Sequence, residues 1–397
     1  MAEKHASIFR SLQYFNARLF FAGLLLSNIG SWLQLTASSL LIYRLTGNAA
    51  DLGYNVAFQF LPMLFLGTWC GALADRHNRR RIALASQAAL AVQALLLGVL
   101  DLSGSINVQT VYALSLLLGV IGAFDNPARR GLVTELVPQI DLPNAMSLNT
   151  AVMTGSRVFG AAIATALVGP IGTGWLFILN GISYAAMIYG LTGLRKSEMY
   201  PPLRRPAGGS PVREVFKFVA GNRRLLTMFW VYVVVSTFSF NFGVALPKLA
   251  DLSWGDDRAF GWVMSVIGIG NLTGALLTAR LKVVSLRWFV GNIALLGLAS
   301  IGMAFASNVW LAFLWAVPLG IGGAAMIASG NAISQQESPP DMRGRLLALT
   351  AVAFLGSTPI GGPITGLIAD AISPEWSLAY GGVVALVCAS VAVLAWR

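Results

Sequence analysis

One short segment concentrates charge between two long uncharged runs. It reads GALADRHNRRRIAL from Gly71 onward and contains Asp75, Arg76, Arg79, Arg80 and Arg81. An acid and arginines this close form ion pairs, and such pairs bias a conformational equilibrium when only one state makes them. We therefore predict a conformational gate of Gly71, these charged residues and Asp125, in which the two acids pair with Arg79 or Arg81. The alternative is that the arginines alone act, as a signal for chain orientation.

Arg157 is the only formal charge near the middle of a long apolar run. A cation at the centre of a bilayer costs about 2.5 to 3.5 kcal/mol on insertion scales, so it must face protein or water. We predict that Arg157 faces a central cavity, where it binds an anionic or carbonyl-rich group of a ligand or biases a nearby carboxylate. The alternative is a structural arginine that caps carbonyls or pairs with an acid of its own half.

Two groups of polar residues recur at helical spacing inside apolar runs. The first group is Ser27, Ser31, Gln34 and Ser38, with Asn28 and Trp32 beside it, and the second is Ser236 and Ser239, near Phe238 and Asn241. Residues three and four apart share one face of a helix, so each group forms a polar stripe. We predict that both stripes line the cavity. The alternative is that they form hydrogen bonds between packed helices, which membrane bundles also use.

None of the sixteen acidic residues stands in the middle of an uncharged run. A buried proton carrier at mid-membrane is therefore not visible in the sequence. Asp101, Asp125 and Asp370, at the ends of such runs, are the candidates for proton coupling. The alternative for each is a solvated helix end.

The composition indicates how these residues are positioned. Hydrophobic residues make up 56% of the 397 residues, charged residues 11%, and the mean hydropathy is +0.71. About 20 apolar residues span a bilayer as a helix, and the runs lack the alternation of a membrane barrel, so we predict an all-α bundle. The twelve predicted spans are Leu19–Tyr43, Leu52–Ala74, Ile82–Leu100, Val108–Phe124, Leu142–Gly169, Gly172–Leu194, Leu225–Pro247, Ala259–Ala279, Trp288–Gln336 divided near Ser307, Leu346–Ala369 and Trp376–Trp396.

A polar segment rich in Pro and Gly divides these spans into six and six. It predicts three parts: a six-helix bundle over 1–194, a cytoplasmic linker over 195–224 and a second six-helix bundle over 225–397. A constant offset of 201 relates Pro138 to Pro339, Gly155-Ser156 to Gly356-Ser357, Gly160 to Gly361, Trp175 to Trp376 and Gly181 to Gly382. We interpret the halves as pseudo-symmetric copies with a substrate site between them.

Lys and Arg in the short loops fall mainly on one side of the predicted spans. The positive-inside rule makes that side cytoplasmic, so we expect a multi-pass protein of the plasma (inner) membrane with both termini in the cytoplasm. The net charge of +11 is then explained by cations that set the membrane topology and contact anionic lipid at the cytoplasmic surface. These cations are scattered over short loops and do not favour nucleic-acid binding. Cys70 and Cys388 lie inside predicted spans as packing residues. No phosphate loop or zinc motif occurs, so we expect no cofactor, no metal and no enzyme activity.

The charged segment resembles a known signature. Gly71-x-Leu73-Ala74-Asp75-Arg76-x-x-Arg79-Arg80 is similar to the segment between the second and third helices of the major facilitator superfamily. Asn78 stands where that pattern has Gly. After Gly, Asn is the residue that most readily adopts the left-handed backbone conformation of a turn. The runs from Asn126 to Pro138, Asn144 to Asn149 and Arg343 to Leu349 resemble the transmembrane secretion effector branch, which contains enterobactin and macrolide exporters.

The resemblance implies a secondary transporter with twelve helices in two domains. It implies export of a small molecule, such as a siderophore, drug or metabolite, by alternating access and proton exchange. From the charged residues themselves, we predict that the gate latches the outward-open state. We expect a monomer whose partners are this substrate, protons and the lipid bilayer. The alternatives are a lipid or lysophospholipid flippase of the same fold, an uptake permease or a membrane scaffold that does not transport.

Overall fold

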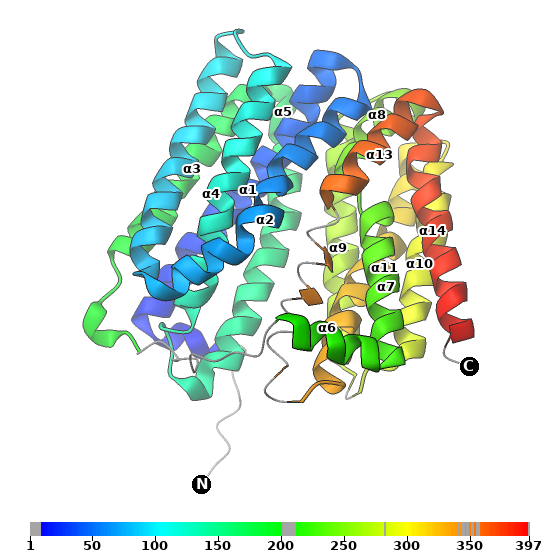
Figure 1. The fold of residues 1–397 in the computed structure, drawn as a ribbon. Helices are drawn as coiled ribbons and strands as arrows, with labels where there is room; N and C mark the ends of the chain where they lie inside the picture. Colours follow the sequence, from blue (N-terminus) through cyan, green and yellow to red (C-terminus); the bar gives the residue numbers. More distant parts are fainter. Residues whose placement is uncertain are drawn as a thin grey trace. The chain divides into compact units, whose positions relative to one another are not determined.

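The described part of the chain is helical and contains no strand (Figure 1). The structure is a computed structural model that describes residues 9–200, 212–281, 283–339, 342, 346, 349–350, 353–354 and 358–395. The side chains of residues 68, 75 and 212–214 lie outside this description, as do Arg343, Arg345, Gly356 and Ser357 of the predicted motif and repeat. The prediction of an all-α membrane protein is confirmed.

The first half begins with a short 3-10 helix and continues through five long helices. They are η1 (Arg10–Gln13), α1 (Phe15–Thr46), α2 (Ala49–Arg76), α3 (Arg79–Leu102), α4 (Val108–Val133) and α5 (Leu142–Thr192), with η2 (Gln139–Asp141) before α5. The helix α5 contains a kink at Gly172, whose φ of 78° favours glycine, so its two parts are the fifth and sixth predicted spans.

The second half follows η3 (Lys196–Glu198) and is also helical. Its described helices are α6 (Val212–Gly221), α7 (Arg223–Ser239), α8 (Phe242–Trp254), α9 (Ala259–Ala279), α10 (Leu286–Ala304), α11 (Val309–Gln336), α13 (Thr358–Ala371) and α14 (Pro374–Ala395). Asn308 accepts a hydrogen bond from the Leu311 amide and begins α11, at the predicted division of the long run.

The helices are long enough to cross a membrane. Nine helical segments within the described residues have the required length and hydropathy, and Gln139–Thr192, with 54 residues, suffices for two crossings. These findings are consistent with the predicted twelve spans, because α7 and α8 together make one crossing and α13 belongs to the eleventh.

Four local features differ from the sequence predictions. The helix α4 continues past Phe124 and includes Asp125, because the acid pairs with Arg129 one turn later. The seventh span is broken between α7 and α8, where Asn241 donates a hydrogen bond to the Thr237 carbonyl. Asn78 has a φ of −68°, so the left-handed turn is wrong; instead its side chain caps α3 by accepting from the Arg81 amide.

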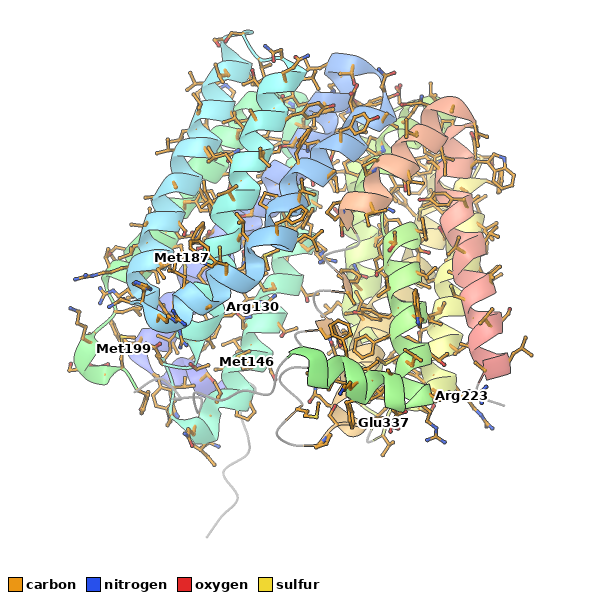
Figure 2. All side chains as sticks on the ribbon, in the orientation of Figure 1. Arg130, Met146, Met187, Met199, Arg223 and Glu337 are labelled. Atoms are coloured by element: carbon orange, nitrogen blue, oxygen red, sulfur yellow. The ribbon has the colours of Figure 1, made fainter. Side chains whose placement is uncertain are left out.

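The fourth difference is a helix inside the predicted linker. In α6, Val215 and Val219 are buried one turn apart, whereas Phe216 and Lys217 are exposed. This helix lies across the end of α7, and Glu337 and Arg223 lie beside it (Figures 1 and 2). The amphipathic pattern of this short helix was not recognised in the sequence, because the flanking residues are rich in Pro, Gly and Arg and indicated a linker.

The chain forms two compact units. Unit 1 contains Met1–Ser38 and Phe65–Arg205, and unit 2 contains Ser39–Leu64 and Pro206–Arg397. Direct contacts attach the second part of α1 and the first part of α2 to unit 2. A Cβ at Gly53 in α2 would lie 2.5 Å from the carbonyl oxygen of Gly362, and Tyr43 in α1 donates a hydrogen bond to Asp251 at 2.7 Å. The domain boundaries at 195 and 225 stay a prediction.

Equivalent glycines make equivalent contacts in the two halves. A Cβ at Gly160 would lie 2.6 Å from the Ile29 carbonyl oxygen in α1, and one at Gly361 would collide with the Thr237 carbonyl in α7. In both halves, the fifth span therefore packs closely on the first span of that half, which supports the predicted repeat.

This packing yields a prediction at Gly160. Replacement by alanine should lower the free energy of unfolding by about 1 to 3 kcal/mol, because the backbone and Trp32 leave no space for a methyl group. Thermal unfolding in detergent measures the effect. The matched control is Gly155→Ala in the same helix, where nothing lies within 4 Å of a Cβ. Equal unfolding midpoints for the two variants would contradict the packing argument.

Candidate functional site

Arg79 forms a half-buried ion pair at the same end of unit 1 as the charged segment. Its Nη1 donates to Glu135 Oε1 at 3.0 Å and to the Gly131 carbonyl at 3.2 Å. A Cβ at Gly131 would lie 2.6 Å from the Arg79 Nε, so the glycine makes room for the guanidinium. Burial raises the pKa of the Glu135 carboxyl, and Arg79 only partly offsets this effect. The pair therefore joins the start of α3 to the end of α4.

Arg80 stabilises a different helix end. Its guanidinium donates to the carbonyl of Thr192, the last residue of α5, at 2.6 Å and to the carbonyl of Leu194, two residues later, at 3.2 Å. These carbonyls have no partner within the helix, and the end of a helix attracts positive charge. Arg80 thus fixes the second part of α5 against the start of α3.

Asp125 is the centre of a buried polar chain in unit 1. Its carboxylate accepts from Gln87 Nε2 at 2.9 Å and pairs with Arg129 Nε at 2.5 Å, and Ser27 donates to Gln87 at 3.2 Å. The chain connects α1, α3 and α4. It satisfies a carboxylate that would be costly to bury alone.

The described side chains do not form the predicted pairing of Asp125 with Arg79 or Arg81. Arg129 is one turn from Asp125 on the same helix and therefore pairs with it at little cost in side-chain freedom. Arg76 and Arg81 are exposed, and a Cβ at Gly71 would meet nothing within 4 Å. The side chain of Asp75 lies outside the described residues, so its part in the gate stays a prediction.

The polar stripe of α1 faces neighbouring helices of unit 1. Asn180 donates to Gln34 at 2.6 Å, Gln34 donates to Gln93 at 3.2 Å, and Ser31 contacts the Tyr184 hydroxyl at 3.2 Å. With the bond from Ser27 to Gln87, these contacts correspond to the second of the two predicted roles, hydrogen bonding between packed helices. Ser38, also buried, belongs to the same face.

The stripe of the seventh span makes similar contacts in unit 2. Ser236 donates to the Ala353 carbonyl at 3.3 Å and Ser239 to the Gly381 carbonyl at 2.7 Å. The ring of Phe238 meets Tyr380 edge to face at 6.3 Å. The break between α7 and α8 exposes backbone carbonyls, and Asn241 satisfies one of them. Broken helices in transporters often stand beside binding sites.

Arg157 and Trp32 lie together where α5 crosses α1. The guanidinium carbon is 4.5 Å from the centre of the Trp32 ring, a cation–π distance. The Nε of Arg157 is buried and has no hydrogen-bond partner among the described residues. Asn28 donates to the Met153 sulfur at 2.9 Å and joins the same two helices. The structure therefore brings Arg157 together with Asn28 and Trp32, which the sequence predicted as part of a different group.

The remaining acidic candidates are hydrogen-bonded at helix ends. Asp101 accepts from Thr173 at 2.5 Å, directly after the kink of α5. Asp370 accepts from the amides of Ala49 and Ala50, at 2.9 and 2.8 Å, and from Lys248 at 2.6 Å. Asp370 therefore fixes the first turn of α2 to α13 and α8 within unit 2.

The sequence prediction missed Gln87, Arg129 and Glu135. Arg129 and Glu135 belong to the motif from Asn126 to Pro138, so the motif carried a signal for both. Gln87 had no such signal, because one amide inside an apolar run shows neither its face nor its partner.

Two further features complete the described surface. A cavity of about 410 Å³ lies in unit 1 between the start of α1 and the residues after α5, and its lining includes Tyr14, Glu198 and Met199. Figure 2 labels Met199. In the described part of the chain, no group of three His, Cys, Asp or Glu side chains is placed to bind a metal ion.

The chain matches one protein family, two characterised transporters and a solved transporter structure. The family model described as transmembrane secretion effector matches residues 6–397. The chain is similar to the staphyloferrin A transporter of Staphylococcus aureus (21% identical, covering 89% of each chain) and to the multidrug efflux pump Tap of Mycolicibacterium fortuitum (25% identical, covering 87% of each). Its fold is similar to that of a bacterial homologue of the human lysosomal transporter Spinster, at 14% identity, 96% coverage of each chain and a TM-score of 0.75.

The contacts of Asp370 yield a stability prediction. Asp370→Asn should lower the free energy of unfolding by about 1 kcal/mol or more, because the amide loses the charge that Lys248 and the start of α2 require. Asp256→Asn is the control, because its pair with Arg258 is about half exposed. Urea or thermal unfolding in detergent compares the two. A loss no larger than that of the control would show that the Asp370 contacts do not stabilise unit 2.

Proposed function

The chain belongs to the transmembrane secretion effector family of the major facilitator superfamily, and from this premise we propose that it exports a small molecule by alternating access. It is a multi-pass membrane transporter. The proposed cargo is a siderophore, a drug or another metabolite, and the proton gradient supplies the driving force. The similarity to a staphyloferrin A transporter and to a multidrug efflux pump supports transport of a small molecule, and the efflux pump supports the outward direction.

One observation carries the proposal of proton coupling. Asp125 lies inside the membrane-spanning helix α4, is buried, and pairs with Arg129 and Gln87. Protonation of the carboxylate removes the charge that Arg129 compensates, so the two protonation states favour different arrangements of α1, α3 and α4. Asp101 and Asp370, which lie at helix ends, are the weaker candidates.

We place the N-terminus and the charged segment in the cytoplasm. In this orientation, Asp75 and its arginine partners form a latch in the outward-open state and separate in the inward-open state. An interfacial ion pair is worth roughly 1 kcal/mol, which changes a conformational equilibrium about fivefold.

Everted membrane vesicles test direction and coupling. Vesicles that contain the protein should accumulate a fluorescent drug such as ethidium, or another member of a compound panel, when respiration acidifies their interior. A protonophore should abolish accumulation, and ATP depletion with respiration intact should not. Asp125→Asn should reduce accumulation at least tenfold, whereas Asp256→Asn should not, because its carboxylate lies in an exposed ion pair. Accumulation that survives the protonophore but stops without ATP excludes proton-driven export.

The latch has its own test at Asp75. Asp75→Asn should reduce transport severalfold without changing the amount of protein inserted, because it removes one partner of an ion pair and leaves the arginines in place. Transport and surface labelling of the loops are measured on the same samples. Arg81→Gln is the matched comparison: if the segment is only an orientation signal, this variant changes topology and Asp75→Asn changes nothing. Normal transport by correctly inserted Asp75→Asn protein refutes the latch.

A further inference from the structure

Arg157 differs from the other buried or half-buried arginines of unit 1 in its partners. Arg79 pairs with Glu135, Arg129 pairs with Asp125, and Arg80 donates to two carbonyls. Among the described residues, Arg157 has no ion pair, and its buried Nε has no hydrogen bond; its guanidinium lies over the Trp32 ring. A buried donor of a charged group without an acceptor is costly, so this arrangement is incomplete in the protein alone.

The position of Arg157 is fixed by tight packing. One turn after it, Gly160 brings α5 so close to α1 that a Cβ there would lie 2.6 Å from both the Ile29 carbonyl oxygen and the Trp32 Cβ. One turn before it, Met153 accepts a hydrogen bond from Asn28. The helix α5 is thus held against α1 both before and after Arg157, and this packing keeps the guanidinium over the indole. Such preorganisation is typical of a binding group and lowers the entropy lost when a ligand binds.

The structural alternative requires a partner that the described residues do not supply. An arginine that caps carbonyls would donate to them, as Arg80 does. An arginine that neutralises an acid would pair with it, as Arg129 does. The Trp32 ring attracts the positive charge through its face but does not accept the Nε–H bond in the plane of the guanidinium. An anion from outside the chain would supply the hydrogen-bond acceptor and the negative charge that Arg157 lacks.

We propose that Arg157 and Trp32 form the recognition site for a carboxylate of the transported molecule. The planar guanidinium presents parallel N–H donors that match the two oxygens of a carboxylate, and the indole holds this fork in position. The substrate class is therefore organic acids of low molecular weight. The site deepens the proposed export function and rests on it. Thr358, the repeat equivalent of Arg157, carries no charge, so the pseudo-symmetric fold does not itself require the cation.

Equilibrium binding to the full-length protein in nanodiscs tests the site. The probes are radiolabelled 1-naphthoate and 1-naphthamide, which share a ring system and differ in charge. The wild-type protein should bind the carboxylate about tenfold more tightly than the amide, the difference expected for a charge-assisted bidentate contact. Arg157→Gln should equalise the two affinities by weakening only the carboxylate. Arg157→Lys should retain part of the preference, because it keeps the charge and loses the fork.

Two controls make the outcome decisive. Arg258→Gln removes an exposed cation and should leave the preference unchanged. Trp32→Phe keeps a ring of weaker cation affinity and should reduce the preference even if Arg157→Gln does not fold. Equal binding of the two probes by the wild-type protein, no binding of either, or an unchanged preference in folded Arg157→Gln protein overturns the proposal. Binding needs no proton gradient, so a failure of proton-driven export leaves the carboxylate preference intact, and equal binding leaves export intact.

Discussion

A bilayer offers no hydrogen bonds, so each polar group inside it must find a partner in the protein. The core of unit 1 follows from this constraint. Ser27, Gln87, Asp125 and Arg129 form one continuous chain of polar contacts through α1, α3 and α4, and Asn180, Gln34 and Gln93 form another. These bonds connect helices that apolar contact alone would hold weakly, because lipid tails are as apolar as leucine. The same constraint makes the incomplete partner set of Arg157 informative.

Packing and charge are distributed differently between the two halves. The glycines that allow the fifth span to approach the first are repeated as Gly160 and Gly361, and Gly181 and Gly382 make corresponding contacts with the third span of each half. Arg157 has no charged counterpart, because Thr358 occupies the equivalent position. A feature present in both halves serves the shared fold, whereas a charge present in one half does not follow from it. This asymmetry is the reason for assigning the paired glycines to the shared fold and Arg157 to the proposed binding site.

The sequence predicted the helical class, the twelve spans and the repeat because hydropathy and glycine spacing are local signals. It ended the fourth span at Phe124, since an uncharged run stops at Asp125 and the pairing with Arg129 is visible only on a helix. It did not show the break of the seventh span, because no proline marks it, nor the capping role of Asn78. Periodicity placed Ser27 and Gln34 on one face of α1. It left open whether that face meets a cavity or a helix, because the neighbour is set by packing in three dimensions.

Burial also decides which ion pairs are able to change. Arg44 and Asp257 pair at 2.6 Å in unit 2 with 40% and 19% of their side chains exposed, so water replaces either partner at little cost. Asp125 and Arg129, with 2% and 14% exposed, have no such substitute, and separating them leaves a charge in a low-dielectric interior. Thermal motion therefore separates the exposed ion pairs at helix ends more easily than the buried pair. Separating Asp125 from Arg129 therefore requires a compensating change in charge, and this requirement is the physical basis for proposing Asp125 as the residue that binds the coupling proton.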